Sequence, residues 1–417
     1  METRIARHGH IASAIFLVAL AIRLAIVLLL PTGYPIDMRG WLETGRFVAT
    51  YGVGYVYDTY QQANAYPPLY FWPLRFAAAM PDPEMALRLL AIIADAACAS
   101  LVWAVARTWL PTQRAILAGL LYALNPAALV TVAWMGMIGD PWFLLPLLGA
   151  VRILVSHRPA WALPLLTLAV CVKPQALALA PLIAAVILLH THPRDLIRPL
   201  LMSAAVLGTT VLPFILAGRM IELIVAVLGF GRRAPYTHNY ADTLWLIVTA
   251  FQWPMRVLDD TALVGALSYR RASLLLFGLL VALAFPVLHA ARDPRMVATV
   301  AAALTLGFFV VSTRMHVNYS FAAFPFLCLL AASGWHGRAA LGAATVGCLT
   351  NWAIEDVPAL HWLPPNMSGI GVQVLVALLY LAAFALVTAP LVVHRLFAHQ
   401  GSAPPPDPAR APLPPHL

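Results

Sequence analysis

The sequence predicts an all-α polytopic membrane protein, and three observations support this. The 417 residues are 62% hydrophobic and only 10% charged, whereas soluble proteins carry roughly a quarter charged residues. Apolar runs of about 17–25 residues, long enough to cross a ~30 Å hydrocarbon core, recur along the chain. The basic residues lie mostly in the short turns between these runs, where they set orientation. The net charge of +9 therefore does not indicate a nucleic-acid partner.

The runs predict about twelve transmembrane helices, which form one integral domain over residues 1–398. The Pro-rich tail, 399–417, is expected to be disordered and cytoplasmic. A basic N-terminus precedes the first run, 11–30, so the N-terminus is expected in the cytoplasm and the loop 31–73 outside. A cleaved signal peptide is disfavoured because the run is long and contains Arg23. The later runs lie at about 85–106, 114–133, 141–155, 159–172, 174–190, 196–217, 270–290, 295–312, 316–332, 338–353 and 369–393.

Residues 243–255 pose the main question of topology. If this segment crosses the membrane, every later basic turn lies outside, against the positive-inside rule. If it enters and returns on the outer face, those turns lie inside, and irregular backbone of this kind is tolerated where it lines a cavity. We favour the re-entrant interpretation. An amphipathic stretch just before it, 220–230, is expected to lie in the membrane interface.

The expected outer face gathers several ionisable residues, and such groups at membrane depth are functional candidates by default. A carboxylate can act as a general base, and cations can hold an anionic leaving group such as phosphate. The candidates are Asp37, Asp140, Lys173, the turn 236–242, Arg314, His316, Glu355 and Asp356. We expect Asp37 to be the base, because it is the first acid of the outer loop and lies at the bilayer edge.

Each candidate also has a plainer interpretation. Asp37 could be a solvated acid of the loop or a helix cap, and Asp140 also precedes a helical stretch and could be a helix cap. Lys173 could extend its ammonium to the interface, although the adjacent Pro174 indicates a helix break. Arg314 and His316 could be an interfacial positive cluster.

Other residues are expected to be structural. Asp95 lies in the middle of an apolar run, and we favour a buried hydrogen-bonding partner that joins two helices. The four cysteines, Cys98, Cys171, Cys328 and Cys348, show no metal-ligand spacing and are expected to be core residues. The sequence contains no Gly-rich phosphate loop, nucleotide motif or zinc site.

Several motifs together resemble the GT-C superfamily of integral-membrane glycosyltransferases, and most closely its bacterial mannosyltransferase-like branch. The motifs occur in the family's order and span residues 37 to 325. They are Asp37, Gly52 and Tyr66-Pro67-Pro68-Leu69-Tyr70 in the first loop, Arg88 with Asp95, Asn125-Pro126, Trp134-Met135-Gly136 with Asp140, Lys173-Pro174-Gln175, Asn239 before Leu244-Trp245, and Thr313-Arg314-Met315-His316 with Tyr319 and Pro325. The chain departs from the family at Met137, where Gln is usual, and at Val317, where Glu is usual.

The resemblance implies a GT-C-like bundle in a bacterial plasma membrane, with its active site on the extracytoplasmic face. The implied reaction moves mannose or a related hexose from a polyprenyl-phosphate carrier to a lipid-linked or cell-envelope acceptor, with inversion. Asp37 would be the base. Arg314, His316 and Lys173 would bind the donor phosphate, and the expected substrate contacts are Asp140, Tyr66, Tyr70, Gln175, Asn239 and Tyr319. Some branches bind a divalent metal at acidic loop residues, but too few acids cluster here to favour one, so no cofactor is expected.

Two other functions share parts of this pattern. A flippase or transporter of a lipid-linked sugar would have similar spans and intramembrane charges, but it should show paired discontinuous helices in two related halves. A structural membrane subunit would not need an outer cluster of acid, cations and aromatic residues. The sequence favours the glycosyltransferase.

Overall fold

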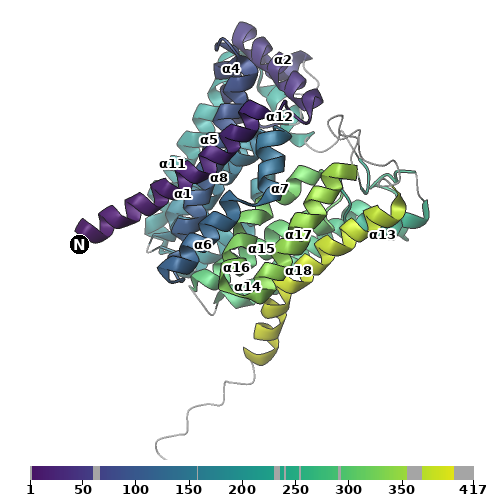
Figure 1. The fold of residues 1–417 in the computed structure, drawn as a ribbon. Coiled ribbons are helices and arrows are strands. Elements are labelled where there is room, and N and C mark those ends of the chain that lie inside the picture. The colour runs from purple at the N-terminus through teal and green to yellow at the C-terminus, as the bar shows by residue number, and fades with distance from the viewer. Residues whose placement is uncertain are drawn as a thin grey trace, which may run out of the picture.

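The structure is a computed structural model, and it describes residues 2–59, 66–156, 158–229, 235–238, 241–252, 255–289, 293–354 and 369–398. These residues form a nearly all-α bundle in which the first long helix lies obliquely across one side (Figure 1). The prediction of an all-α chain is therefore largely confirmed. The predicted disordered tail, 399–417, lies outside the described residues.

The helices begin and end close to the predicted apolar runs. The long elements are α1 (Glu2–Leu29), α5 (Pro83–Ala106), α6 (Thr112–Ala123) continued by α7 (Pro126–Ala128) and η4 (Leu129–Trp134), α8 (Gly139–Leu154), η5 (Pro159–Trp161) with α9 (Ala162–Val172), η6 (Pro174–Leu179) with α10 (Ala180–His190), α11 (Pro193–Leu216), α14 (Tyr269–His289), α15 (Pro294–Val311), η8 (Val317–Ala323) with α16 (Phe324–Ser333), α17 (Trp335–Ile354) and α18 (Ile370–Ala398). The shorter elements are α2 (Pro35–Tyr51), η1 (Val53–Tyr55), α3 (Val56–Thr59), η3 (Pro68–Tyr70), α4 (Phe71–Ala78), α12 (Met220–Leu228), α13 (Leu244–Thr249), η7 (Ala250–Gln252), β1 (Ala262–Val264) and β2 (Leu267–Ser268).

Within the described residues, six helical segments are long and apolar enough to cross a membrane: His8–Leu29, Pro83–Ala106, Thr112–Trp134, Pro193–Leu216, Pro294–Val311 and Ile370–Val393. Three more apolar helical segments, Pro159–Val172, Pro174–His190 and Val317–Ser333, are shorter. The chain therefore has the helices of a polytopic membrane protein. The total of twelve crossings stays a prediction.

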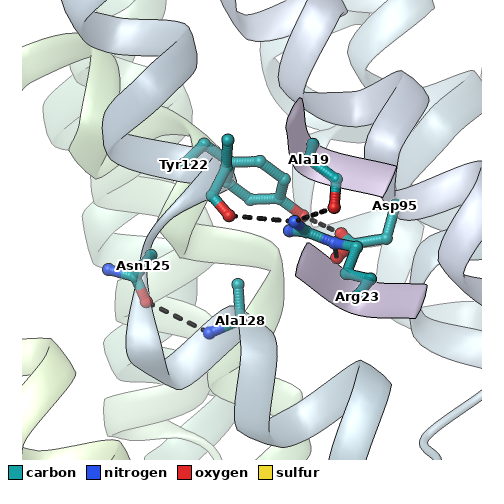
Figure 2. Close-up of polar contacts among 7 residues, drawn as sticks. Ala19, Arg23, Asp95, Tyr122, Asn125 and Ala128 are labelled. Atoms are coloured by element: carbon teal, nitrogen blue, oxygen red, sulfur yellow. Dashed lines mark hydrogen bonds and ion pairs between the residues drawn. The ribbon is translucent and has the colours of Figure 1, made fainter. Parts of the chain in front are cut away.

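A buried ion pair joins the first helices of the bundle. Arg23 of α1 donates through Nε to the Asp95 carboxylate of α5, and the Tyr122 hydroxyl of α6 donates to the same carboxylate (Figure 2). Both charged side chains are fully buried. Arg23 also donates to the main-chain oxygens of Ala19 and Ala123. Asp95 is thus the structural residue that the sequence predicted, and it joins three helices rather than two.

Helix breaks place polar residues at one end of the bundle. The Pro174 ring disfavours helical backbone at the residue before it, and Lys173 is accordingly extended (φ −152°, ψ 127°) between α9 and η6. The break predicted at Lys173-Pro174 is confirmed. η4 is a π-helix, a form that is rare and frequent at functional sites, and it ends at Trp134, five residues before α8 begins.

The segment between α12 and α14 differs from an all-α expectation. β1 and β2 form a two-stranded antiparallel hairpin with Gly265 at positive φ (55°) in its turn. The helix α13 has six residues, about 9 Å at 1.5 Å per residue, which is much shorter than a ~30 Å bilayer core. α13 is thus too short to cross a membrane, and re-entry stays a prediction.

The predicted amphipathic stretch forms α12, which exposes Ile221, Val225 and Leu228. Arg219, just before α12, pairs with Asp58 of the first loop at 2.9 Å. This contact ties the first loop to the segment after α11.

Candidate functional site

The first outer loop packs on the segment between η4 and α8. The Gly33 N–H donates to the Trp134 main-chain oxygen over 2.7 Å. Gly136 has positive φ (73°), a conformation that glycine adopts without strain, and a Cβ there would lie 3.2 Å from Met38 Cε. This close contact brings the start of α2, which carries Asp37, toward the start of α8.

Asp37 lies in the first turn of α2 but does not cap it. The N-cap residue is Tyr34, and no side chain makes a capping hydrogen bond. The capping alternative is therefore wrong for Asp37. Across the described part of the chain, its carboxylate accepts no hydrogen bond and forms no ion pair.

Asp140 and Lys173 form a buried ion pair. Lys173 Nζ lies 2.6 Å from Asp140 Oδ1, and both side chains are almost fully buried. Asn318 Nδ2 donates to Asp140 Oδ2 at 2.8 Å. Asp140 is not a helix cap, because the N-cap position of α8 is Ile138 and has no side-chain bond. Lys173 does not extend to the interface either, so both plainer interpretations are wrong.

Aromatic rings enclose the Lys173 ammonium. Nζ lies 5.1 Å from the centroid of the Tyr319 ring and 5.7 Å from that of Phe143, distances at which a ring face attracts a cation. Gln175 lies two residues further on, and its side chain is close to the Tyr319 hydroxyl. Lys173 and Gln175 of one predicted motif therefore lie together with Tyr319 of another.

Tyr66 and Tyr70 form a wall beside the two acids. Their rings stack with centroids 3.9 Å apart and 11° between planes. Tyr70 also contacts Trp142 of α8, and the Tyr57 hydroxyl donates to the Tyr66 main-chain oxygen over 2.7 Å. Burial first and the charge of Asp37 second raise the pKa of Tyr66 well above its usual value. Its phenol thus stays protonated at neutral pH and remains a donor.

The electrostatic environment of Asp37 suits a base. Burial raises its pKa to about 6, while the Lys173 charge opposes the rise and the Asp140 charge adds to it. A pKa just below neutral pH leaves the carboxylate ionised and still basic enough to accept a proton. Asp37, Asp140 and Lys173 thus form one electrostatic group, called the acid–lysine site below.

His316 lies near this group but differs from the sequence expectation in charge. Burial, followed by the charges of Lys173 and Arg256, lowers the pKa of His316 to about 4. The imidazole is therefore neutral at pH 7 and could offer an anion one N–H donor rather than a positive charge. Its ring lies 5.9 Å from that of Tyr319.

Arg314 forms an ion pair with Asp259, a residue that the sequence did not single out. Its Nε and Nη2 donate to Asp259 over 2.6 and 2.7 Å, and Asp259 is fully buried. Thr313 Oγ1 donates to the same acid. Arg314 has positive φ (66°), which is uncommon for a non-glycine residue and is retained where surroundings enforce it. The pair holds the turn that carries His316, and phosphate binding by Arg314 stays a prediction.

The structure adds residues that the sequence did not single out. Asn318 lies between His316 and Tyr319 of one motif but had no assigned role, and neither Asp259 nor Arg256 belonged to a motif. Asp242 belongs to the candidate turn 236–242 but had no role of its own; it is buried, which raises its pKa to about 7, and its main-chain N–H donates to Asn351 Oδ1.

Some candidates lie outside the described residues, namely Asn239, Glu355 and Asp356. The four cysteines are free and buried, as expected. No group of three His, Cys, Asp or Glu side chains suited to a metal ion occurs in the described part of the chain.

Comparison with known proteins adds no assignment: no protein-family model matches this chain, and no curated protein matches it.

Proposed function

We propose that this chain is a membrane glycosyltransferase that moves a sugar, mannose or a related hexose, from a polyprenyl-phosphate carrier to a lipid-linked or cell-envelope acceptor. The observation that carries the proposal is the carboxylate of Asp37, which has a pKa of about 6 and lies beside the Asp140–Lys173 pair. Among the described residues, no hydrogen bond or ion pair occupies it. A general base needs a pKa near the working pH and an atom that can reach the substrate proton, and the unoccupied oxygens of Asp37 meet the second need.

The proposed reaction uses Asp37 as the base. Asp37 takes the proton from an acceptor hydroxyl, and the hydroxyl oxygen attacks the anomeric carbon from the side opposite the carrier phosphate. The bond from that carbon to the phosphate oxygen breaks, and its electron pair leaves with the phosphate. The products are the inverted glycoside and the polyprenyl phosphate. A bacterial plasma membrane with this site on its outer face is part of the proposal.

The leaving phosphate needs donors that act where charge develops. The Lys173 ammonium has three N–H donors, and the described structure engages one of them with Asp140. His316 would add one neutral N–H, and Arg314 would contribute by holding the His316 turn or through direct contact. Tyr66 and Trp142 would offer aromatic faces to the apolar face of a sugar ring, and Tyr70, which is fully buried, would support Tyr66 by stacking on it. Gln175, Asn239 and Tyr319 would be further contacts.

The test uses purified protein in lipid nanodiscs with synthetic polyprenyl-phosphate mannose and a panel of lipid and glycan acceptors. Mass spectrometry detects the product. Asp37→Asn removes the base with little change of shape, so turnover should fall to about a hundredth of wild type or less, given the usual 10²–10⁴-fold value of general-base assistance. Glu43→Gln, an exposed acid on the same helix, is the matched control and should keep wild-type turnover.

Full turnover by Asp37→Asn would overturn the assignment of the base. Failure to convert any donor and acceptor pair, together with movement of the labelled donor between leaflets, would favour the flippase instead. Loss of turnover in Asp140→Asn alone would not identify a base, because both Asp140 oxygens already accept hydrogen bonds.

A further inference from the structure

A polar cavity lies at the end of the bundle opposite the acid–lysine site. α8 begins beside Asp140 and ends at Leu154, and α9 returns to Lys173, which bonds Asp140. The turn that joins α8 to α9 must therefore lie at the far end, and so must the turn after α10. These two turns line a cavity of about 720 Å³.

The cavity is lined by more positive than negative charge. Arg158, Arg194 and Arg198 contribute guanidinium groups, and Asp195 is the acid among the lining residues. In the described part of the chain, none of the three guanidinium groups has an ion-pair partner. Thr191 adds a buried hydroxyl without a hydrogen-bond partner among the described residues. These donors match the oxygens of a phosphate group.

The cavity continues onto a lipid-compatible surface. Ile197 lines it and is 58% exposed, and Leu200 and Leu201 follow on α11 with 52% and 65% exposure. Only 17% of the residues in the most apolar stretch of α11 are buried in the bundle. Trp161 also lines the cavity, and tryptophan is enriched at the level of lipid headgroups. A molecule with a phosphate head and acyl chains would satisfy both surfaces at once.

We propose that this cavity binds the headgroup of an anionic phospholipid in the leaflet opposite the acid–lysine site, with its acyl chains along α11. Basic pockets between transmembrane helices are suited to anionic headgroups. The arginines hold the phosphate oxygens, Thr191 adds a hydroxyl donor, and Ile197 begins the path of the chains. A soluble phosphate would use the donors but not the apolar surface.

The test measures lipid binding to the purified full chain by native mass spectrometry in detergent. The probes are dioleoyl phosphatidylglycerol, dioleoyl phosphatidylcholine and inorganic phosphate. Wild type should bind phosphatidylglycerol at least tenfold more tightly than either other probe. A basic residue near an anionic membrane surface is worth about fivefold in affinity. The double variant Arg158→Gln/Arg194→Gln should thus bind phosphatidylglycerol about 30-fold more weakly, with phosphatidylcholine binding unchanged.

The matched control is Arg107→Gln/Arg114→Gln, which removes the same charge from the turn between α5 and α6 without touching the cavity. It should keep phosphatidylglycerol affinity within about twofold. Equal loss in the control, or full retention in the cavity variant, would overturn the site. Inorganic phosphate binding as tightly as phosphatidylglycerol would overturn the lipid assignment. If the double variant fails to fold, Arg198→Gln alone should show about a fivefold loss.

Discussion

At the scale of single residues, the two carboxylates of the acid–lysine site differ in their hydrogen-bond partners. Asp140 has both oxygens engaged, by Lys173 and Asn318, whereas Asp37 has neither engaged among the described residues. Burial acts on both carboxylates, so what separates them is access: the oxygens of Asp140 already accept hydrogen bonds, whereas those of Asp37 can accept a proton from a substrate hydroxyl. The proposed roles of the two acids follow from this contrast.

The pKa of Asp37 predicts the pH dependence of the proposed reaction. The base works only when ionised, and its pKa of about 6 means that protonation inactivates it below that pH. We expect kcat/KM to rise about tenfold per pH unit up to pH 6 and to level off above it. Initial rates from pH 5 to 8 check this.

Asp242 is the control residue for the pH profile, because burial raises its pKa to about 7 and its titration would lie about one pH unit above that of Asp37. Asp242→Asn should leave the acidic limb near pH 6 unchanged. A wild-type limb near pH 7 that disappears in Asp242→Asn would assign the base to Asp242.

The Asp140–Lys173 pair predicts a strong dependence of stability on both partners. Lys173→Met leaves a buried carboxylate without its counter-charge, which typically costs about 3–5 kcal/mol. Asp140→Asn leaves the buried Lys173 ammonium without its counter-charge in the same way. The double variant Asp140→Asn/Lys173→Met removes both charges and should recover most of the lost stability. Unfolding of the four proteins in the same detergent measures the coupling, and additive losses would contradict this interpretation.

At the scale of elements, the start of α8 positions the aromatic wall. A Cβ at Gly139 would lie only 2.4 Å from Tyr70 Cε2, so the Tyr70 ring occupies the space that any side chain would fill. The positions of the aromatic wall, which belongs to the first loop, and of Asp140 on α8 therefore both depend on Gly139.

Gly139→Ala should displace Tyr70, lower stability by about 1–3 kcal/mol as overpacking does, and reduce turnover. Gly149→Ala on the same helix is the control, because its Cβ would meet Leu165 Cδ1, a flexible side-chain end, at 3.2 Å. Thermal unfolding and product formation measure both variants. Equal effects of the two substitutions would show that the Tyr70 contact is not special.

At the scale of the whole molecule, the order of the helices implies which ends share a side. The acid–lysine site brings together the start of α2, which follows α1, the start of α8, and the break between α9 and η6. Asn318 of η8, which follows α15, bonds Asp140 at the same site, and α13 is too short to cross the membrane. Under this arrangement, the turn between α16 and α17 lies on the same side as the N-terminus.

Labelling with a membrane-impermeant maleimide tests this topology, and the native cysteines are buried. Tyr51→Cys, at an exposed position, should react in intact cells. Trp335→Cys and Arg114→Cys, both at exposed positions, should react only after permeabilisation. Reaction of Trp335→Cys but not Arg114→Cys in intact cells would mean that residues 243–255 cross the membrane.

The sequence by itself determined the helical class, the ends of the apolar helices and the break at Lys173-Pro174. These features depend on local properties, namely hydrophobic length, proline geometry and the cost of burying unpaired backbone in lipid. It also predicted the structural role of Asp95, because a single acid inside an apolar run must find a partner.

Only the tertiary structure decided which polar groups meet. Asp140 bonds Lys173, which is 33 residues away in the sequence, and Asn318, which is 178 residues away. Arg314 bonds Asp259, which is 55 residues away. Arg314 pairs with an acid in no recognised motif, and His316 loses its charge through burial. Partner choice and desolvation depend on packing between distant segments, and a pattern read along one chain does not contain those contacts.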